Sequence, residues 1–190
     1  FLYDLRTALH AEGFTLQVYK TEEQLSKERE ILTEILSRPP RALIVDPVQS
    51  ALFNPNLDLY RALLKKSIPV VFMRHPYPQL DNCPCIREDD INGGRMLTEY
   101  LITQGHTMIG SLLCADDASG ADRYRGMLEV IRDHGLPLPD DRAQWFSSTD
   151  LRQLFLTHSA GFIKKAVQDS LHSCTAILCH NDVVAYELVR

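Results

Sequence analysis

A repeated order of elements restricts the fold of this sequence more than any other feature. Short apolar runs rich in β-branched residues alternate with stretches whose apolar residues have the spacing of an α-helix. Most of the runs are continuous, which is typical of strands buried on both faces of a sheet. The expected strands are residues 14–19, 42–45, 68–73, 108–114, 143–146 and 175–179.

Glycines mark the ends of three expected helices. Gly13, Gly105 and Gly135 each follow a helical stretch and precede the next strand or the turn that leads to it. Because glycine adopts the left-handed backbone conformation without steric cost, we expect a left-handed cap at each. The repeat of helix, glycine and strand predicts right-handed βαβ units, and therefore an α/β fold with parallel sheets flanked by helices on both faces.

A proline-rich segment interrupts this order. Residues 74–85 contain three prolines and no helical or strand periodicity. A length of 190 residues suits either one domain or two lobes. We interpret the segment as the crossing between two α/β lobes, residues 1–80 and 81–190. Helical spacing at the very start and the very end of the sequence also suggests an excerpt of a longer protein.

Composition limits the environment and the partners. Lys and Arg total 20 and Asp and Glu total 25, so the net charge is −5, which argues against direct binding of nucleic acid. No apolar run approaches the roughly 18 residues of a membrane helix. The five cysteines lack the spacing of a disulfide framework, and the N-terminal sequence lacks the pattern of a signal peptide. We therefore expect a cytoplasmic chain with no membrane partner.

Polar residues directly after the expected strands are the first candidates for a ligand site. In open parallel sheets, ligands bind at the carboxyl ends of the strands. Forked Arg donors and carboxylate acceptors suit a polyhydroxylated ligand. Two alternatives stay open, because Asp182 could serve only as a helix cap and Arg74 could form only a salt bridge. The candidates are Asp46, Arg74, His75, Asp116, Asp117, His180, Asn181 and Asp182.

Other possible motifs are weaker. Asn92 followed by Gly93 and Gly94 lacks the spacing of a phosphate loop, and we interpret it as a helix N-cap followed by glycines that allow close packing. The cysteines at 83 and 85 are too close together for the usual zinc thiolate pair. Because no nucleophile elbow or cofactor motif is found either, we expect no metal, no cofactor and no enzymatic activity.

Six stretches in order resemble one family. They resemble the effector-binding core of LacI/GalR-type repressors, and the resemblance covers essentially the whole chain. Residues 45–52, 55–56 and 115–120 are most similar to the arabinose-responsive AraR-type repressors, which carry a GntR-type winged-helix head. The six stretches are residues 41–45, 68–72, 89–95, 100–106, 123–126 and 175–182.

The resemblance implies a two-lobed fold like that of type I periplasmic binding proteins, incomplete in both lobes. The family's first strand is expected before Phe1, and further strands are expected after Arg190. It also implies a homodimer that binds a free sugar, L-arabinose by preference, between its lobes. Sugar binding would close the lobes and release operator DNA, which is held by a head outside this chain.

The resemblance also assigns ligand-binding roles. The cleft arginine falls on Arg123 and the cleft aspartate on Asp182. The family's aromatic falls on Trp145 or Phe146, of which we favour Phe146. The full expected set is Arg123, Asp182, Asp89, Asp90 in place of the usual Asn, Arg74 and Phe146. Two other classes stay open: a sugar-binding protein of a transport system, and an enzyme on a two-lobed scaffold.

Overall fold

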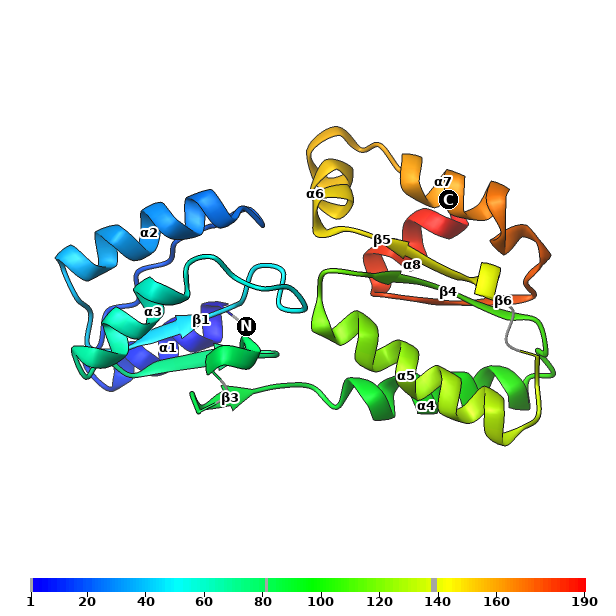
Figure 1. Ribbon diagram of the computed structural model, residues 1–190, viewed down its shortest axis with the longest axis horizontal. Coiled ribbons are helices and arrows are strands. Elements are labelled where there is room, and N and C mark those ends of the chain that lie inside the picture. Colours follow the sequence, from blue (N-terminus) through cyan, green and yellow to red (C-terminus); the bar gives the residue numbers. More distant parts are fainter. Residues whose placement is uncertain (1, 81, 138–139) are drawn as a thin grey trace.

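The computed structural model describes residues 2–80, 82–137 and 140–190. Two α/β lobes lie side by side (Figure 1). The first lobe contains α1 (Leu2–Ala11), α2 (Leu25–Ser37), β1 (Leu43–Val45), α3 (Leu57–Lys65), β2 (Val70–Met73), η1 (Pro78–Leu80) and β3 (Cys85–Ile86). The second contains α4 (Asp90–Thr103), β4 (Ile109–Cys114), α5 (Ala118–Asp133), η2 (Asp140–Arg142), β5 (Ala143–Phe146), α6 (Ser148–Thr157), α7 (Gly161–Asp169), η3 (Leu171–Ser173), β6 (Ala176–Cys179) and α8 (Asp182–Val189).

The first lobe is built on a parallel sheet of order β1-β2-β3. Its core combines β2 with the apolar faces of α2 and α3, and Phe72, Tyr60 and Tyr77 meet there with ring centroids 5.8 to 5.9 Å apart. A polar hub lies within this core. The buried carboxylate of Glu28 accepts hydrogen bonds from the hydroxyls of Tyr60 and Tyr77 and from two asparagine side chains.

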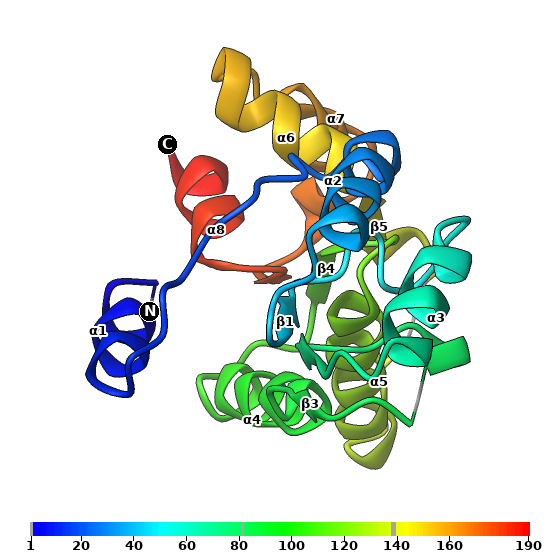
Figure 2. The same ribbon diagram turned by 90° about the vertical axis from the view of Figure 1, so that its left-hand side faces the viewer.

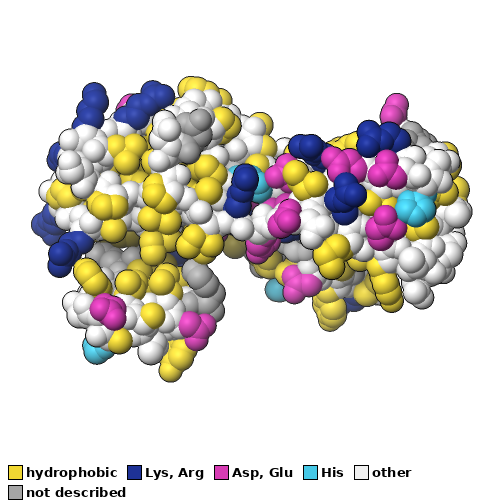
Figure 3. Space-filling view, turned by 90° about the horizontal axis from the view of Figure 1, so that it is seen from below, with side chains coloured by type: hydrophobic (Ala, Val, Ile, Leu, Met, Phe, Trp, Pro, Cys, Tyr) yellow, Lys and Arg dark blue, Asp and Glu magenta, His cyan; other side chains and the backbone are white. Residues whose placement is uncertain are grey.

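Helix α1 contributes no buried residue to either core. It stands apart from the other helices of the first lobe (Figure 2). In the space-filling view it forms a separate projection beside a hollow (Figure 3). The extended segment of residues 14–20 connects it to the rest of the lobe.

The second lobe has a parallel sheet of order β5-β4-β6. All six residues of the central strand β4 are buried, as its continuous apolar pattern predicts. Leu113 packs with Met127 and Ile131 of α5 on one face, whereas Leu112 packs with residues of α7 and α8 on the other. Helices therefore cover both faces of this sheet.

The three predicted glycine caps are confirmed. Gly13, Gly105 and Gly135 have φ angles of 77°, 90° and 63°, in the left-handed region. The predicted close packing is also confirmed at Gly94, where a Cβ would lie 2.2 Å from the carbonyl oxygen of Arg123. The N-cap prediction was wrong, because Asp89 caps α4 by accepting from the amide of Asn92 at 3.2 Å.

Two expected features differ in the structure. Residues 14–19 form no strand, because the described residues place no strand beside them and an extended segment needs a partner to form a ladder. The boundary expected after residue 80 falls too early. Strand β3 pairs with β2 at Phe72↔Cys85, so the first sheet continues to Ile86. A two-residue strand is too short to show periodicity in the sequence.

Candidate functional site

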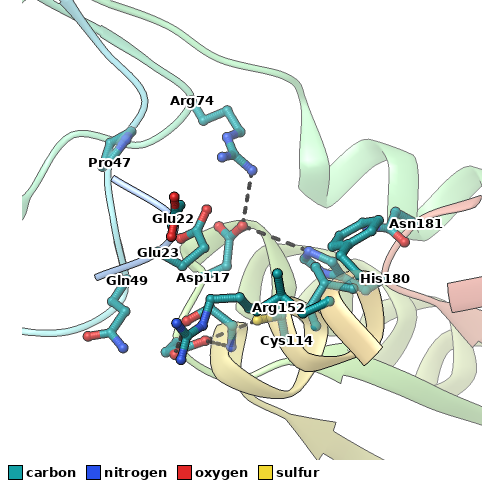
Figure 4. Close-up of a pocket in the computed structure, with 15 residues that line it drawn as sticks. Glu22, Glu23, Pro47, Gln49, Arg74, Cys114, Asp117, Arg152, His180 and Asn181 are labelled. Atoms are coloured by element: carbon teal, nitrogen blue, oxygen red, sulfur yellow. Dashed lines mark hydrogen bonds and ion pairs between the residues drawn. The ribbon is translucent and has the colours of Figure 1, made fainter. Parts of the chain in front are cut away.

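A cavity of about 330 Å³ lies between the lobes, where the loops after β1, β2, β4 and β6 meet (Figure 4). The carboxyl ends of parallel strands converge there, as expected for a ligand site in this kind of sheet. The lining residues come from both lobes. They are Glu22, Glu23, Pro47, Gln49 and Arg74 from the first, and Cys114, Asp116, Asp117, Ser148, Leu151, Arg152, Phe155, Leu156, His180 and Asn181 from the second.

Arg74 bridges the lobes at this cavity. Its Nε donates to Oδ1 of Asp46 at 2.8 Å within the first lobe, and its Nη1 lies 3.3 Å from Oδ2 of Asp117 in the second. Burial raises the pKa of a carboxyl, but Arg74 and the amide of Ser119 outweigh burial and hold the pKa of Asp117 below its ordinary value. Asp117 is therefore an ionised acceptor at neutral pH.

A second contact between the lobes forms around the start of α5. The hydroxyl of Ser50 in the first lobe donates to Oδ1 of Asp117 at 3.2 Å and accepts from the amide of Ala118 at 2.9 Å. Asp117 also caps α5 by accepting from the amide of Ser119. The carboxylate that faces the cavity is thus fixed by its own helix and by the opposite lobe.

Asp116 has a different task. Its two oxygens accept from the amide and the hydroxyl of Ser148, both at 2.8 Å, and the thiol of Cys114 donates to it. These bonds tie the end of β4 to the start of α6. Asp116 therefore positions the cavity wall, while the neighbouring Asp117 faces the cavity.

His180 supplies a neutral polar group. Burial lowers its pKa to about 4, so the imidazole is uncharged at neutral pH. Its Nε2 lies 3.8 Å from Oδ2 of Asp117, and its buried Nδ1 has no hydrogen-bond partner among the described residues. A neutral imidazole can donate to or accept from a hydroxyl.

Backbone strain is concentrated at this cavity. Among the described residues, six non-glycine residues have a left-handed φ, and four of them line it: Glu22, Glu23, Gln49 and Arg74. Such conformations cost about 1–3 kcal/mol each and cluster at ligand clamps and switch regions. The strain supports a functional interpretation of the cavity independently of its charges.

A second cavity, of about 490 Å³, adjoins the first and shares His180 and Asn181 with it. Arg123 and Asp182 line it together with Gly94 and Leu97 of α4. It lies within the second lobe, between α4 on one side and β6 and α8 on the other.

Arg123 is held by three acceptors. Its guanidinium donates to the carbonyl oxygen of His180, to the buried carboxylate of Asp90 at 2.8 Å and to Glu88 at 3.3 Å. Burial raises the pKa of Asp90 above its ordinary value, although Arg123 opposes this shift. Asp90 also lies 4.0 Å from His75 of the first lobe, so the Arg123 cluster reaches the junction between the lobes.

The structure divides the expected site residues into groups. Arg74 lines the first cavity, and Arg123 and Asp182 line the second. Asn181 accepts from the amide of Val184 and so caps α8. The exposed carboxylate of Asp182 also contacts the start of this helix, because its Oδ1 accepts from the amide of Val183 at 3.1 Å.

The remaining expected residues, Asp89, Asp90 and Phe146, do not line either cavity but contact residues that do or fix their positions. Asp90 binds Arg123, and Asp89 caps α4. Phe146 is 4% exposed and packs against the rings of Phe162 and His180 at centroid distances of 4.8 and 5.7 Å. It is not among the described residues that line either cavity.

Sequence reasoning missed part of the first cavity. Asp117 and His180 were among the strand-end candidates but were not selected for the final site. Glu22 and Glu23 follow the expected strand 14–19, so the same rule could have found them. Helix α6, part of which lines the cavity, was missed entirely, although Leu151, Leu154 and Phe155 have helical spacing.

Two features are absent from the described residues, 2–80, 82–137 and 140–190. These residues contain no group of three or more His, Cys, Asp or Glu side chains placed to hold a metal ion. They also contain no helix long and apolar enough to span a membrane.

Two α/β lobes with parallel sheets and a cavity between them define a periplasmic-binding-protein-like fold. The sequence agrees: the family described as "Periplasmic binding proteins and sugar binding domain of LacI family" matches residues 5–188. The chain belongs to this family.

Known proteins similar to the chain are bacterial transcriptional regulators. The chain is 30% identical over 182 residues to an arabinose metabolism transcriptional repressor of Geobacillus stearothermophilus, covering 96% of this chain and 49% of that protein. It is 30% identical over 186 residues to the HTH-type transcriptional regulator GalR of Escherichia coli, with 95% and 49% covered. The chain thus spans about half the length of these curated relatives.

Solved structures agree on the fold. The Cra transcriptional dual regulator of Pseudomonas putida, in complex with fructose 1-phosphate, superposes with a TM-score of 0.79 at 19% identity. The superposition covers 99% of this chain and 65% of that one.

Proposed function

We propose that this chain is the effector-binding domain of a cytoplasmic bacterial transcriptional repressor and that a free sugar binds between its lobes. The observation that carries the proposal is the inter-lobe cavity, where the ion pair of Arg74 and Asp117 and the neutral His180 meet. Charged acceptors, forked donors and a neutral imidazole together match the mixed donor and acceptor character of sugar hydroxyls.

The ligand site in this proposal extends over both cavities. Arg74 would contact the sugar from the first cavity, and Arg123 and Asp182 would contact it from the second. His180 and Asn181 line both cavities and lie between these two groups. Asp90 orients Arg123, Asp89 fixes the start of α4, and Phe146 supports the ring of His180 from behind.

L-Arabinose is the proposed effector. Its support is the arabinose metabolism repressors among the relatives, from Geobacillus stearothermophilus and Halalkalibacterium halodurans. D-Galactose is the nearest competitor on chemical grounds, because its pyranose ring has the same hydroxyl configuration as that of L-arabinose and adds a hydroxymethyl group.

The proposed mechanism links lobe arrangement to DNA release. A sugar can shift the lobes only by binding one arrangement more tightly, and coupling free energies of about 1–3 kcal/mol are typical. The lobes would act in a homodimer, and operator DNA would be held by a GntR-type head outside this chain. The net charge of −5 agrees with DNA contacts that lie elsewhere.

The alternative of a transport protein has less support. The relatives reported above are transcriptional regulators, whereas the fold alone is common to both classes.

A thermal-shift screen of the full-length protein tests the proposal. L-Arabinose, D-galactose, D-ribose and D-fructose are added separately, and operator release is followed by gel shift. We expect L-arabinose to raise the melting temperature and to release DNA. If only another of these sugars stabilises the protein, the assignment of L-arabinose as effector is wrong, but the repressor function still stands. If none of the four has an effect, the sugar-sensing function is contradicted.

A further inference from the structure

The two sides of the inter-lobe cavity differ in chemistry. Arg74, Asp117 and His180 form a polar floor at the strand ends. One face of α6 forms a wall: Ser148, Leu151, Arg152, Phe155 and Leu156 all line the cavity. Their spacing of three and four residues places them on one side of the helix. The wall is largely apolar.

Phe155 has no role in the core of the second lobe. Its side chain is 58% exposed, whereas the adjacent Leu154 is 4% exposed and buried in the lobe. Among the described residues that line the cavity, Phe155 is the only one with a phenyl ring. Phe146, which the family resemblance favoured as the sugar-facing aromatic, is buried under Phe162 and His180.

Helix α6 is anchored firmly at its start. Ser147 and Asp150 form a capping box, and Asp116 holds both the amide and the hydroxyl of Ser148. The helix lies on the side of the second lobe that faces the first (Figure 1). The backbone that carries Phe155 is therefore anchored relative to the polar floor, which limits the cost of placing its ring against a ligand.

We propose that Phe155 is a specificity-determining residue that packs its ring on the C–H face of the sugar while the polar floor binds the hydroxyls. This inference rests on the proposed sugar-binding function. The negative face of an aromatic ring attracts the slightly positive C–H edge of a ligand, and an exposed ring on a cavity wall gains apolar burial when the ligand arrives. The ligand class is a sugar with a continuous C–H face.

The test measures sugar affinity of the full-length protein by calorimetry, with L-arabinose and D-galactose as probes. We expect Phe155→Ala to weaken the better-bound sugar about tenfold, Phe155→Leu to weaken it less, and Phe155→Tyr to stay close to wild type. Phe53→Ala is the matched control, because Phe53 is 70% exposed and does not belong to the described lining of either cavity. Neither Ala variant should change the melting temperature of the ligand-free protein.

A fluorescence readout separates ligand contact from a structural effect. Trp145 is the only tryptophan of the chain, so Phe155→Trp adds one reporter in the cavity. Saturating sugar should change the emission of this variant more than it changes the emission of wild type. If wild type binds sugar and Phe155→Ala binds it equally well, the role of Phe155 is wrong while the proposed function stands. If wild type binds none of the four sugars of the thermal-shift screen, both fail; if it binds only D-ribose or D-fructose, that sugar becomes the probe for the Phe155 variants.

Discussion

The guanidinium of Arg74 in the first lobe reaches the carboxylate of Asp117 in the second, with 3.3 Å between Nη1 and Oδ2. Each partner is fixed within its own lobe, Arg74 by Asp46 and Asp117 by the start of α5. The pair is therefore sensitive to the distance between the lobes. A ligand that binds beside this ion pair would therefore have an affinity that depends on the distance between the lobes, and its binding would change that distance.

Asp117→Asn tests this pair. Asparagine can still cap α5, so the substitution removes the charge and keeps the helix start. We expect sugar affinity to fall about tenfold, because a charge-assisted hydrogen bond is worth about 1.5–3 kcal/mol. Unfolding free energy should change by about 1 kcal/mol or less, as for other partly exposed pairs.

The matched control is Asp58→Asn. Asp58 pairs with Arg29 at the same N···O distance of 3.3 Å on the outer surface of the first lobe, away from both cavities. Calorimetric titration should show no change in sugar affinity for this variant. Equal losses in both variants would mean that the ion pair at the cavity has no special role.

Arg123→Ala and Asp182→Ala test the second cavity. Both side chains line it, and the proposed DNA-binding head lies outside this chain. We expect both full-length variants to bind operator DNA as wild type does and to lose sugar-induced release, with effector affinity lowered at least about tenfold. Gel shifts with increasing sugar measure both properties.

Arg125→Ala is the control for Arg123. It lies on the same helix, is exposed, and pairs with Glu129 at the surface. Release by sugar should be normal in this variant. Normal release in Arg123→Ala and Asp182→Ala as well would remove these two residues from the site.

The buried His180 predicts a specific pH dependence of stability. Its pKa is about 4 in the folded protein, below the ordinary value of 6.5, so the unfolded state binds more protons between these two values. Unfolding free energy should therefore fall as pH decreases from 6.5 towards 4, by up to about 1.4 kcal/mol per pH unit. Above pH 6.5 this contribution is complete and constant.

Comparison with His180→Gln isolates this contribution. Urea unfolding of wild type and variant at pH 7, 6, 5 and 4.5 gives the difference in slope. Asp90 acts in the opposite direction, because its raised pKa makes the folded state bind more protons just above pH 4, but it is common to both proteins. Parallel curves between pH 6.5 and 4.5 would contradict a buried, neutral imidazole.

Much of the fold could be predicted from local pattern. The continuous apolar run of β4 and the glycines after α1, α4 and α5 each determine a local conformation that the structure confirms. Residues 14–19 have the same kind of run, yet they form no strand, because strand formation depends on a partner that local sequence does not specify.

The site could be predicted in part for the same reason. The rule that ligands bind at strand ends placed Arg74, Asp117 and His180 among the candidates, and all three line the inter-lobe cavity. Phe155 could not be found in this way. Phe155 lies on the cavity wall because α6 of the second lobe faces the first lobe. The periodicity of the local sequence cannot predict this arrangement of the two lobes.

The crossing of α4 and α5 provides a test by glycine substitution. A Cβ at Gly94 would lie 2.2 Å from the carbonyl oxygen of Arg123, which is backbone and cannot move without shifting α5. We expect Gly94→Ala to lower the unfolding free energy by about 1–3 kcal/mol or more, as overpacking does. Because the clash displaces Arg123, sugar affinity should fall as well.

The neighbouring Gly93 is a control of the same residue type in the same helix. A Cβ there meets nothing within 4 Å, so Gly93→Ala adds helix propensity without a clash. This variant should be more stable than wild type by about 0.5–1 kcal/mol. Thermal and urea unfolding of the two variants measure the contrast. If Gly94→Ala were as stable as Gly93→Ala, the helices would not cross as closely as described, and the position of Arg123 would have to be revised.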